Sequence, residues 1–532
     1  MKPTSRPVKG LMAAVAAVAL IASACGSDDD SSGESDSTVA ATDDTTDGST
    51  APTDGASGGT LIAGQGAEPD RFDPHLTTAG VSFQVLENVY DTLVQPGDDL
   101  SMEPALATDW SVSDDGLVWT FNLREGVTFH NGRELTADDV VYSLERIKNP
   151  DTGSGAAFRL DNVESIVAVD PLTVEITVSQ PTPNLPVLVG GYKGMAIVAQ
   201  ENVEDGTIDT APIGTGPFTF ETYTPGEGVT LAKNENYWQE GLPLLDGVEF
   251  RVIPDPTVLL TNLQTGEVDW VDSVPPADLE DLQSDGDFVV GTAPAGDYHY
   301  FALNENRAPF DDVRVRQAIA TAIDREEITE AATFGAGVAT QTAIPAGNFW
   351  SFDYSPYEAG DIEAAQALLD EAGVTDLEIE FLVSSDFPET VTQAQVIAAQ
   401  LEPLGVDVVI NDVDFATWLD LQGQGDFDAF MLSWIGNIDP DEFYYAQHRT
   451  DGTFNFQGYS NPEVDEILDA ARVEADQDAR KALYDQAAAI IVDDASYIYL
   501  YNPLSVDAWS NGVSGYTTRP DSAVRFLNTT VS

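Results

Sequence analysis

Cysteine, histidine and basic side chains are scarce in this chain of 532 residues, which holds one Cys, four His and 22 Lys and Arg. With Cys25 as the sole thiol no internal disulfide can form, and four scattered histidines argue against a dedicated transition-metal site. Against the 22 basic residues stand 91 Asp and Glu, for a formal net charge of −69. Because Lys and Arg bind nucleic-acid phosphates and anionic head groups, this imbalance excludes nucleic acid as a partner and indicates a strongly solvated surface.

Signatures of catalysis are missing as well. The sequence has no Gly-x-Ser-x-Gly elbow, no Walker loop, no His-Glu-x-x-His and no complete Gly-x-Gly-x-x-Gly. It therefore predicts a protein that is not an enzyme and that has no cofactor and no resident metal. Asp439, Asp441 and Glu442 could bind Ca²⁺ weakly, but in so acidic a chain we interpret such clusters as solvated surface.

The N-terminus carries a targeting signal. Lys2, Arg6 and Lys9 precede an apolar run over 11–22, which is too short to span a bilayer and is typical of a signal peptide over 1–24. The small residues that follow, and then Cys25, resemble the signal of bacterial lipoproteins, although Ala22 stands where that pattern favours Leu. This resemblance implies lipidation of Cys25; the alternative is an ordinary secreted protein with a stray cysteine.

A low-complexity segment separates this signal from the first apolar strand. Residues 27–59 are rich in Asp, Ser, Thr, Gly and Ala and hold no Lys, Arg or aromatic residue. Such a composition buries too little apolar surface to fold, so 25–58 are predicted to be a lipidated cysteine followed by a disordered acidic tether. A cleaved pro-segment is the alternative.

The rest of the chain alternates strand and helix patterns. A first buried strand is expected near 60–64 and a helix capped by Ser82 after it. Two apolar runs, 377–383 and 406–410, enclose a helical segment and predict a parallel βαβ unit. Further helices are expected at 256–263, 313–322, 362–372 and 391–404. This mixture predicts an α/β protein.

Five sequence blocks resemble bacterial extracellular solute-binding protein family 5, the substrate-binding lipoproteins of peptide and nickel ABC importers. They are LATDWSVSDDGLVWTFNLREGVTFHNGRELTADDV at 106–140, PIGTGPF at 212–218, NENYW at 234–238, PFDDVRVRQAI at 309–319 and GYSNPEVD at 458–465. The resemblance covers nearly everything after Gly59. From the residues themselves, these blocks are mostly scaffold, with glycines that suit turns and acids near helix starts.

The resemblance implies a two-lobed periplasmic-binding-protein type II fold of cluster C, with an extra subdomain inserted in the first lobe. It divides the chain into 59–105 (lobe I), 106–210 (inserted subdomain), 211–302 (lobe I), 303–500 (lobe II) and 501–532 (return to lobe I). Two crossing strands near 300–303 and 500–503 are expected to form the hinge that closes on the ligand.

The strongest ligand candidate is the segment LSWIGNIDP at 432–440, an apolar strand that runs into a Gly-containing turn beside acids. Trp434 and Gly436 belong to this predicted site. In peptide-binding relatives an Asp in the turn pairs with the ligand amine, whereas here Asn437 stands in its place. Either Asp439 takes over this contact or the ligand lacks a free α-amine.

Aromatic side chains are expected to complete the pocket, because they bury large surfaces without demanding one side-chain pattern of the ligand. The candidates are Phe72, Tyr298, Tyr300, Phe349 and Trp350, for each of which ordinary core packing is the alternative. Arg71 could bind a carboxylate or form a surface ion pair.

Together these observations predict a monomeric, lipid-anchored, extracytoplasmic binding protein of an ABC importer. Its expected partners are a small solute, peptide-like by resemblance, the membrane permease, and the membrane itself through lipidated Cys25. The alternatives are a nickel chelate, an oligosaccharide or an opine on the same fold, or a non-transport lipoprotein enzyme.

Overall fold

The computed structural model describes residues 58–434 and 438–532. The predicted signal peptide, Cys25, all but the last residue of the tether, Gly436 and Asn437 therefore lie outside the described residues. Within the described part of the chain, no helix has the length and apolar character needed to cross a bilayer.

One large mixed sheet runs through the fold. Its strand order is β16-β15-β17-β13-β18-β11-β1-β10-β9-β8, and β12 and β14 also pair with β18. Its strands are β1 (Thr60–Gln65), β8 (Phe218–Thr224), β9 (Gly228–Lys233), β10 (Gly247–Val252), β11 (Trp270–Val271), β12 (Phe288–Pro294), β13 (Tyr298–Leu303), β14 (Gly337–Ala339), β15 (Glu378–Val383), β16 (Asp407–Asp412), β17 (Ala429–Trp434) and β18 (Ile498–Ser510). We call the part from β11 to β8 the first lobe and the part from β16 to β13 the second lobe.

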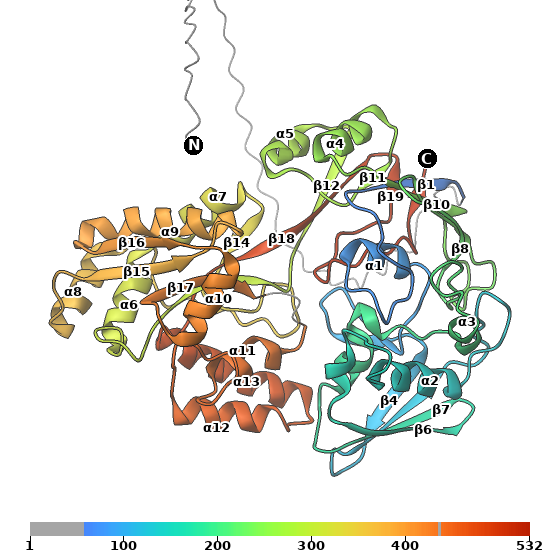
Figure 1. Ribbon diagram of the computed structural model, residues 1–532, viewed down its shortest axis with the longest axis horizontal. Helices are drawn as coiled ribbons and strands as arrows, with labels where there is room; N and C mark the ends of the chain where they lie inside the picture. The colour runs from blue at the N-terminus through green and yellow to red at the C-terminus, as the bar shows by residue number, and fades with distance from the viewer. Residues whose placement is uncertain (1–57, 435–437) are drawn as a thin grey trace, which may run out of the picture. The chain divides into compact units, whose positions relative to one another are not determined.

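Strand β18 belongs to both lobes and can be followed in red in Figure 1. Its first residues pair antiparallel with β13 of the second lobe, and residues 504–510 pair with β12. Ala508 and Trp509 also pair with β11 of the first lobe. The predicted hinge segments 300–303 and 500–503 lie in β13 and β18, and their role as a hinge stays a prediction.

A second, four-stranded antiparallel sheet interrupts the first lobe. Its order is β4-β5-β7-β6, and helix α2 packs on it (Figure 1). Its core is apolar, with Phe121, Leu144 and Ile176 completely buried. The elements of this lobe outside the main sheet are α1 (Gly80–Leu86), β2 (Val94–Pro96), β3 (Met102–Pro104), β4 (Ala107–Val112), β5 (Val118–Leu123), α2 (Ala137–Lys148), β6 (Val163–Asp170), β7 (Thr173–Val178), α3 (Gln200–Glu204), α4 (Pro256–Thr265), α5 (Leu279–Ser284), β19 (Val513–Ser514) and β20 (Thr530–Val531).

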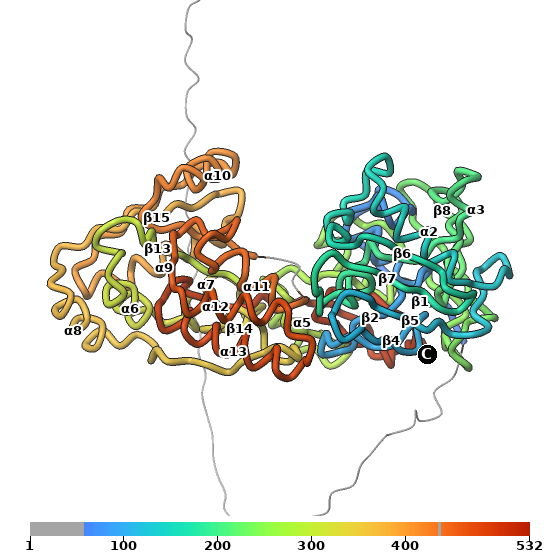
Figure 2. Tube along the Cα trace, turned by 90° about the horizontal axis from the view of Figure 1, so that it is seen from below, coloured from blue at the N-terminus to red at the C-terminus, as the bar shows by residue number. Residues whose placement is uncertain are grey.

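The second lobe carries the remaining helices. They are α6 (Val313–Ala322), α7 (Arg325–Thr333), α8 (Ile362–Ala372), α9 (Pro388–Leu401), α10 (Phe415–Gln424), α11 (Pro440–His448), α12 (Pro462–Ala471) and α13 (Gln477–Asp493). The last three pack against one another, as Figures 1 and 2 both show. The predicted βαβ unit is confirmed, because β15 and β16 are parallel neighbours joined through α9.

Local signals in the sequence set most element ends. Helices α6 and α8 have the predicted ends, whereas α9 begins three residues earlier than predicted, at Pro388, and ends three residues earlier, at Leu401. The prediction that Ser82 caps the first helix is wrong, because α1 begins at Gly80. The Ser82 hydroxyl instead donates to Asp70 at 2.7 Å. A Ser close to a helix start can thus serve a neighbouring loop as well as the helix.

Candidate functional site

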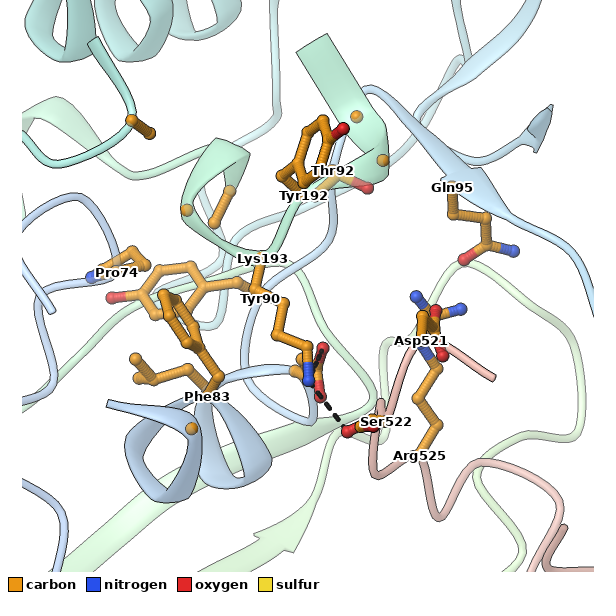
Figure 3. Close-up of a pocket in the computed structure, with 18 of the residues that line it drawn as sticks. Pro74, Phe83, Tyr90, Thr92, Gln95, Tyr192, Lys193, Asp521, Ser522 and Arg525 are labelled. Carbon is orange, nitrogen blue, oxygen red and sulfur yellow. Dashed lines mark hydrogen bonds and ion pairs between the residues drawn. The ribbon is translucent and has the colours of Figure 1, made fainter. Parts of the chain in front are cut away.

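A cavity of about 660 Å³ lies against the first lobe. Figure 3 shows Phe83, Tyr90 and Lys193 on one side of it, facing Asp521 and Arg525 on the other. The walls come from α1 and the loop after it, the glycine-rich segment 190–194 where two short helical turns meet, the segment 295–297 ahead of β13, and the C-terminal segment 520–527. Ile438, just before α11, adds a side chain from the second lobe.

Asp91 is a half-buried carboxylate that lines this cavity. It accepts hydrogen bonds from the Thr215 hydroxyl at 2.8 Å, the Trp238 ring nitrogen at 3.0 Å and the Tyr237 hydroxyl at 3.3 Å. Burial raises the pKa of Asp91, and the three donors act in the opposite direction. Since neutral donors occupy both of its oxygens, Asp91 holds the loops of the cavity together.

Two ion pairs lie in the wall near the C-terminal segment. Lys193 Nζ lies 3.4 Å from a Glu87 oxygen and donates to the Ser522 carbonyl at 2.8 Å. Asp521 pairs with Arg519 at 3.0 Å. Burial raises the pKa of Glu87, while the nearby Lys193 acts to lower it. The contacts of Lys193 join the glycine-rich segment 190–194 to the end of α1 and to the return segment, whereas the Asp521–Arg519 pair lies within the return segment.

Arg159 also lines the cavity and has partners in both lobes. Its guanidinium lies over the ring of Tyr192, and one of its nitrogens donates to Glu442 of α11 at 3.3 Å.

Arg525 differs from Lys193 and Arg159, the other two cations that line the cavity. Within the described residues no carboxylate lies within 4.0 Å of its guanidinium, although the charges of Glu87, Asp91 and Asp521 act on it from farther away.

The Tyr90 hydroxyl is a further polar group at the cavity, and among the described residues it is unsatisfied. Tyr90 is 5% exposed and lines the cavity, and its hydroxyl has no hydrogen-bond partner among residues 58–434 and 438–532. An unsatisfied buried hydroxyl costs free energy, so a polar atom of a bound solute would stabilise it.

A sequence profile described as "Bacterial extracellular solute-binding proteins, family 5 Middle" matches residues 101–455. The chain belongs to this family. "Heme-binding protein A" of Haemophilus influenzae is 31% identical over 513 residues, which cover 89% of this chain and 92% of that protein. The "Probable di/tripeptide-binding protein 5" of Pseudomonas aeruginosa is 32% identical over 500 residues, covering 87% and 94%. The solved structure of HbpA2 from Haemophilus parasuis matches with a TM-score of 0.83 at 26% identity, covering 89% of this chain and 100% of that one.

Family 5 membership establishes the two-lobed α/β fold and a role in solute binding for this chain. Five of the predicted ligand residues meet in one aromatic cluster of the second lobe: Trp434, Tyr298, Tyr300, Phe349 and Trp350. Tyr298 and Trp434 are cross-strand partners on β13 and β17. None of the five lines the cavity, so their contact with a ligand stays a prediction.

Asp439 is 1% exposed and forms a bidentate ion pair with Arg480, with both oxygen–nitrogen distances at 2.7 Å. It also caps α11 by accepting from the Asp441 amide at 3.0 Å. The interpretation of this acidic cluster as solvated surface is therefore wrong for Asp439. Its carboxylate is already neutralised by protein groups, which weakens its candidacy as the substitute amine ligand.

Phe72 and Arg71 lie apart from the cavity lining. Phe72 is buried in the core of the first lobe and makes edge contacts with Phe220 and Tyr223, both at 5.0 Å between ring centroids. Arg71 lies 3.5 Å from Asp70 and is 41% exposed, which confirms the surface ion pair.

Sequence reasoning missed Lys193, Asp521 and Arg525. One signal could have pointed to the two cations among them: basic residues are so rare in this chain that each is a candidate ligand contact. No local pattern, however, indicates that residues 520–527 return to α1. For metals, the described residues contain no group of three or more His, Cys, Asp or Glu side chains placed to hold an ion.

Proposed function

We propose that this family 5 protein is the substrate-binding component of an ABC importer, and that it captures a short peptide in the cavity without altering it chemically. In this proposal the two lobes close on the ligand through β13 and β18, and a permease accepts the closed complex. Export by the signal at 1–24 and anchoring through lipidated Cys25 complete the proposal. The N-terminal sequence pattern supports both.

The cavity is the observation that carries the proposal. Its volume of about 660 Å³ lies within the range of about 300–1,000 Å³ that small-molecule sites occupy. Its lining combines apolar surface, such as Phe83 and Leu86, with a few polar groups that can orient a ligand. Ile438 and the segment 295–297 also line the cavity, so a bound ligand can contact residues on both sides of the crossover strands.

A peptide suits this lining better than the other solutes. Cations and carboxylates both lie at the cavity, and a peptide offers both signs of charge together with an apolar body. A curated relative named for di- and tripeptides points the same way. Ile438 follows Asn437 directly in the sequence, so contact between the ligand and the predicted site residues Gly436 and Asn437 is part of the proposal.

Filling the cavity tests the proposal. Gly80 lines the cavity, and a Cβ atom there would meet no atom within 4 Å, so Gly80→Phe should occupy the cavity without disturbing the fold. Gly423 on α10 is equally open and lies outside the cavity lining, which makes Gly423→Phe the matched control. Calorimetry with di-, tri- and tetra-alanine should show at least tenfold weaker binding to Gly80→Phe and unchanged binding to the control.

The same titrations should include glutathione, haemin, a nickel–histidine chelate, maltotriose and an opine. Binding of one of these in place of the peptides would overturn the peptide assignment. Peptide binding that is equal in all three proteins would show that the cavity is not the site.

A further inference from the structure

We propose that Arg525 binds the terminal carboxylate of the ligand, which makes the free carboxylate a requirement for tight binding. This inference deepens the proposed function and rests on it. It assigns to the C-terminal return segment a role in specificity as well as in closing the first lobe.

The charge balance of the cavity is the first observation. Its lining holds three cations, Arg159, Lys193 and Arg525, and four carboxylates, Glu87, Asp91, Asp297 and Asp521. Over the whole chain 22 basic residues stand against 91 acidic ones. The cavity is thus far less acidic than the protein as a whole, and it can admit an anionic group that the rest of the surface would repel.

The other two cations already have direct partners. Lys193 is held by Glu87 and by the Ser522 carbonyl, and Arg159 by Glu442 and the Tyr192 ring. Glu87 and Glu442 already offset the charges of these two cations, although each cation keeps N–H donors that a ligand could use. Arg525 has no ion pair within 4.0 Å and no hydrogen bond from its guanidinium among the described residues.

The carboxylates near Arg525 have other donors. Glu87 accepts from the Val524 amide at 3.1 Å and pairs with Lys193, and Asp521 pairs with Arg519. Asp91 is satisfied by its three neutral donors. These acids keep Arg525 from being an isolated charge, yet they leave its planar fork of N–H donors without a direct acceptor. That fork matches the two oxygens of a carboxylate.

Asn88 holds the backbone on either side of Arg525. Its side-chain amide donates to the Val524 carbonyl at 2.8 Å and accepts from the Phe526 amide at 3.1 Å. Val524 and Phe526 are buried in the core of the first lobe, while Arg525 between them is half-buried and lines the cavity. The backbone that carries Arg525 is thus held in place before a ligand binds, so the entropy cost of ordering is confined to the side chain itself.

The experiment compares trialanine with trialaninamide, which differ only in the terminal carboxylate. By calorimetry the wild-type protein should bind the acid at least about tenfold more tightly, as expected for a charge-assisted hydrogen bond. In Arg525→Gln this preference should fall below twofold, and Arg525→Lys should keep part of it. Arg314→Gln, which removes an exposed arginine on α6, is the matched control and should keep all of it.

The outcomes separate this inference from the proposed function. If the wild type binds neither peptide, the peptide function fails. If it binds both equally, or if Arg525→Gln keeps the preference for the acid, the peptide function stands and the role of Arg525 is overturned. If Arg525→Gln does not fold, Arg525→Lys decides the question: a preference unchanged from the wild type contradicts a bidentate contact, and a reduced one supports it.

Discussion

Asp439 and Arg480 form a buried ion pair at the start of α11, where the side chains are 1% and 4% exposed. The helix N-terminus and the guanidinium both stabilise the carboxylate, so its desolvation is compensated by several contacts at once. Arg480 in turn lies over the ring of Trp350, at 5.1 Å from its centroid. This arrangement connects two residues that the sequence indicated as ligand contacts, and it uses both for packing.

Asp439→Ala should therefore act on stability. Removing one partner of a buried pair leaves an uncompensated charge, and the free energy of unfolding should fall by about 3–5 kcal/mol. Urea denaturation measures this change. Asp98→Ala is the control: Asp98 accepts a single hydrogen bond from Arg519 at 2.8 Å and is 93% exposed, so a loss below about 1 kcal/mol is expected. A stable Asp439→Ala protein with lost ligand affinity would instead restore Asp439 as a ligand group.

At the scale of elements, the crossover strands are tied together by one polar cluster. His299 of β13 stacks on Tyr501 of β18 with ring centroids 4.4 Å apart. Gln393 of α9 donates to the Tyr501 hydroxyl at 2.7 Å and lies 3.0 Å from His299 Nδ1. Burial lowers the pKa of His299 to about 4, so the ring is neutral where the strands cross.

This cluster predicts a pH dependence. The folded pKa of His299, about 4, lies below its unfolded value of 6.5, so the unfolded chain binds the proton more tightly. The stabilisation by neutral His299 is fully present above pH 6.5 and is lost as the pH falls toward 4, by on the order of 3 kcal/mol. His299→Gln has no proton to gain there.

Urea unfolding of the wild type and of His299→Gln is measured between pH 7.5 and 4. The comparison separates the contribution of His299 to the pH dependence from that of the other histidines. The difference between the two free energies of unfolding should shift in favour of the variant as the pH falls. A difference that is constant over this range would mean that His299 titrates normally in the folded protein.

On the scale of the whole molecule, the net charge of −69 dominates the electrostatics. Like charges at this density repel one another in the compact state more than in the expanded unfolded chain. The few cations are mostly used in local pairs, such as Arg133 with Asp139 and Glu201. Attraction on the surface therefore cannot offset the general repulsion.

Salt should consequently stabilise this protein. Raising NaCl from 0.05 to 1 M shortens the screening length from well over 10 Å to about 3 Å, and the thermal midpoint should rise by a few degrees. Differential scanning calorimetry at fixed pH measures the shift, and sucrose at equal osmolality controls for solvent exclusion. A midpoint that falls with NaCl would show that ion pairs, rather than repulsion, control the stability.

The features that follow from the sequence alone are local or contiguous along the chain. The ends of α6 and α8 follow from apolar spacing and caps within four residues along the chain, and the parallel β15–α9–β16 unit follows from the order of its patterns. The family blocks led to the two-lobed fold because they are contiguous strings. The export signal predicted in the first 25 residues rests on a contiguous string as well, and it stays a prediction.

The set of residues that line the cavity, in contrast, depends on packing between distant parts of the chain. Asn88 contacts Val524 and Phe526, which lie 436 and 438 positions later in the sequence. Glu87 contacts Val524 over a separation of 437 positions. No periodicity reports contacts at such separations, because they form when the return segment packs against α1. The same holds for Asp439: the sequence shows a carboxylate in a turn, but its pairing with Arg480, 41 residues later, depends on how α11 and α13 pack.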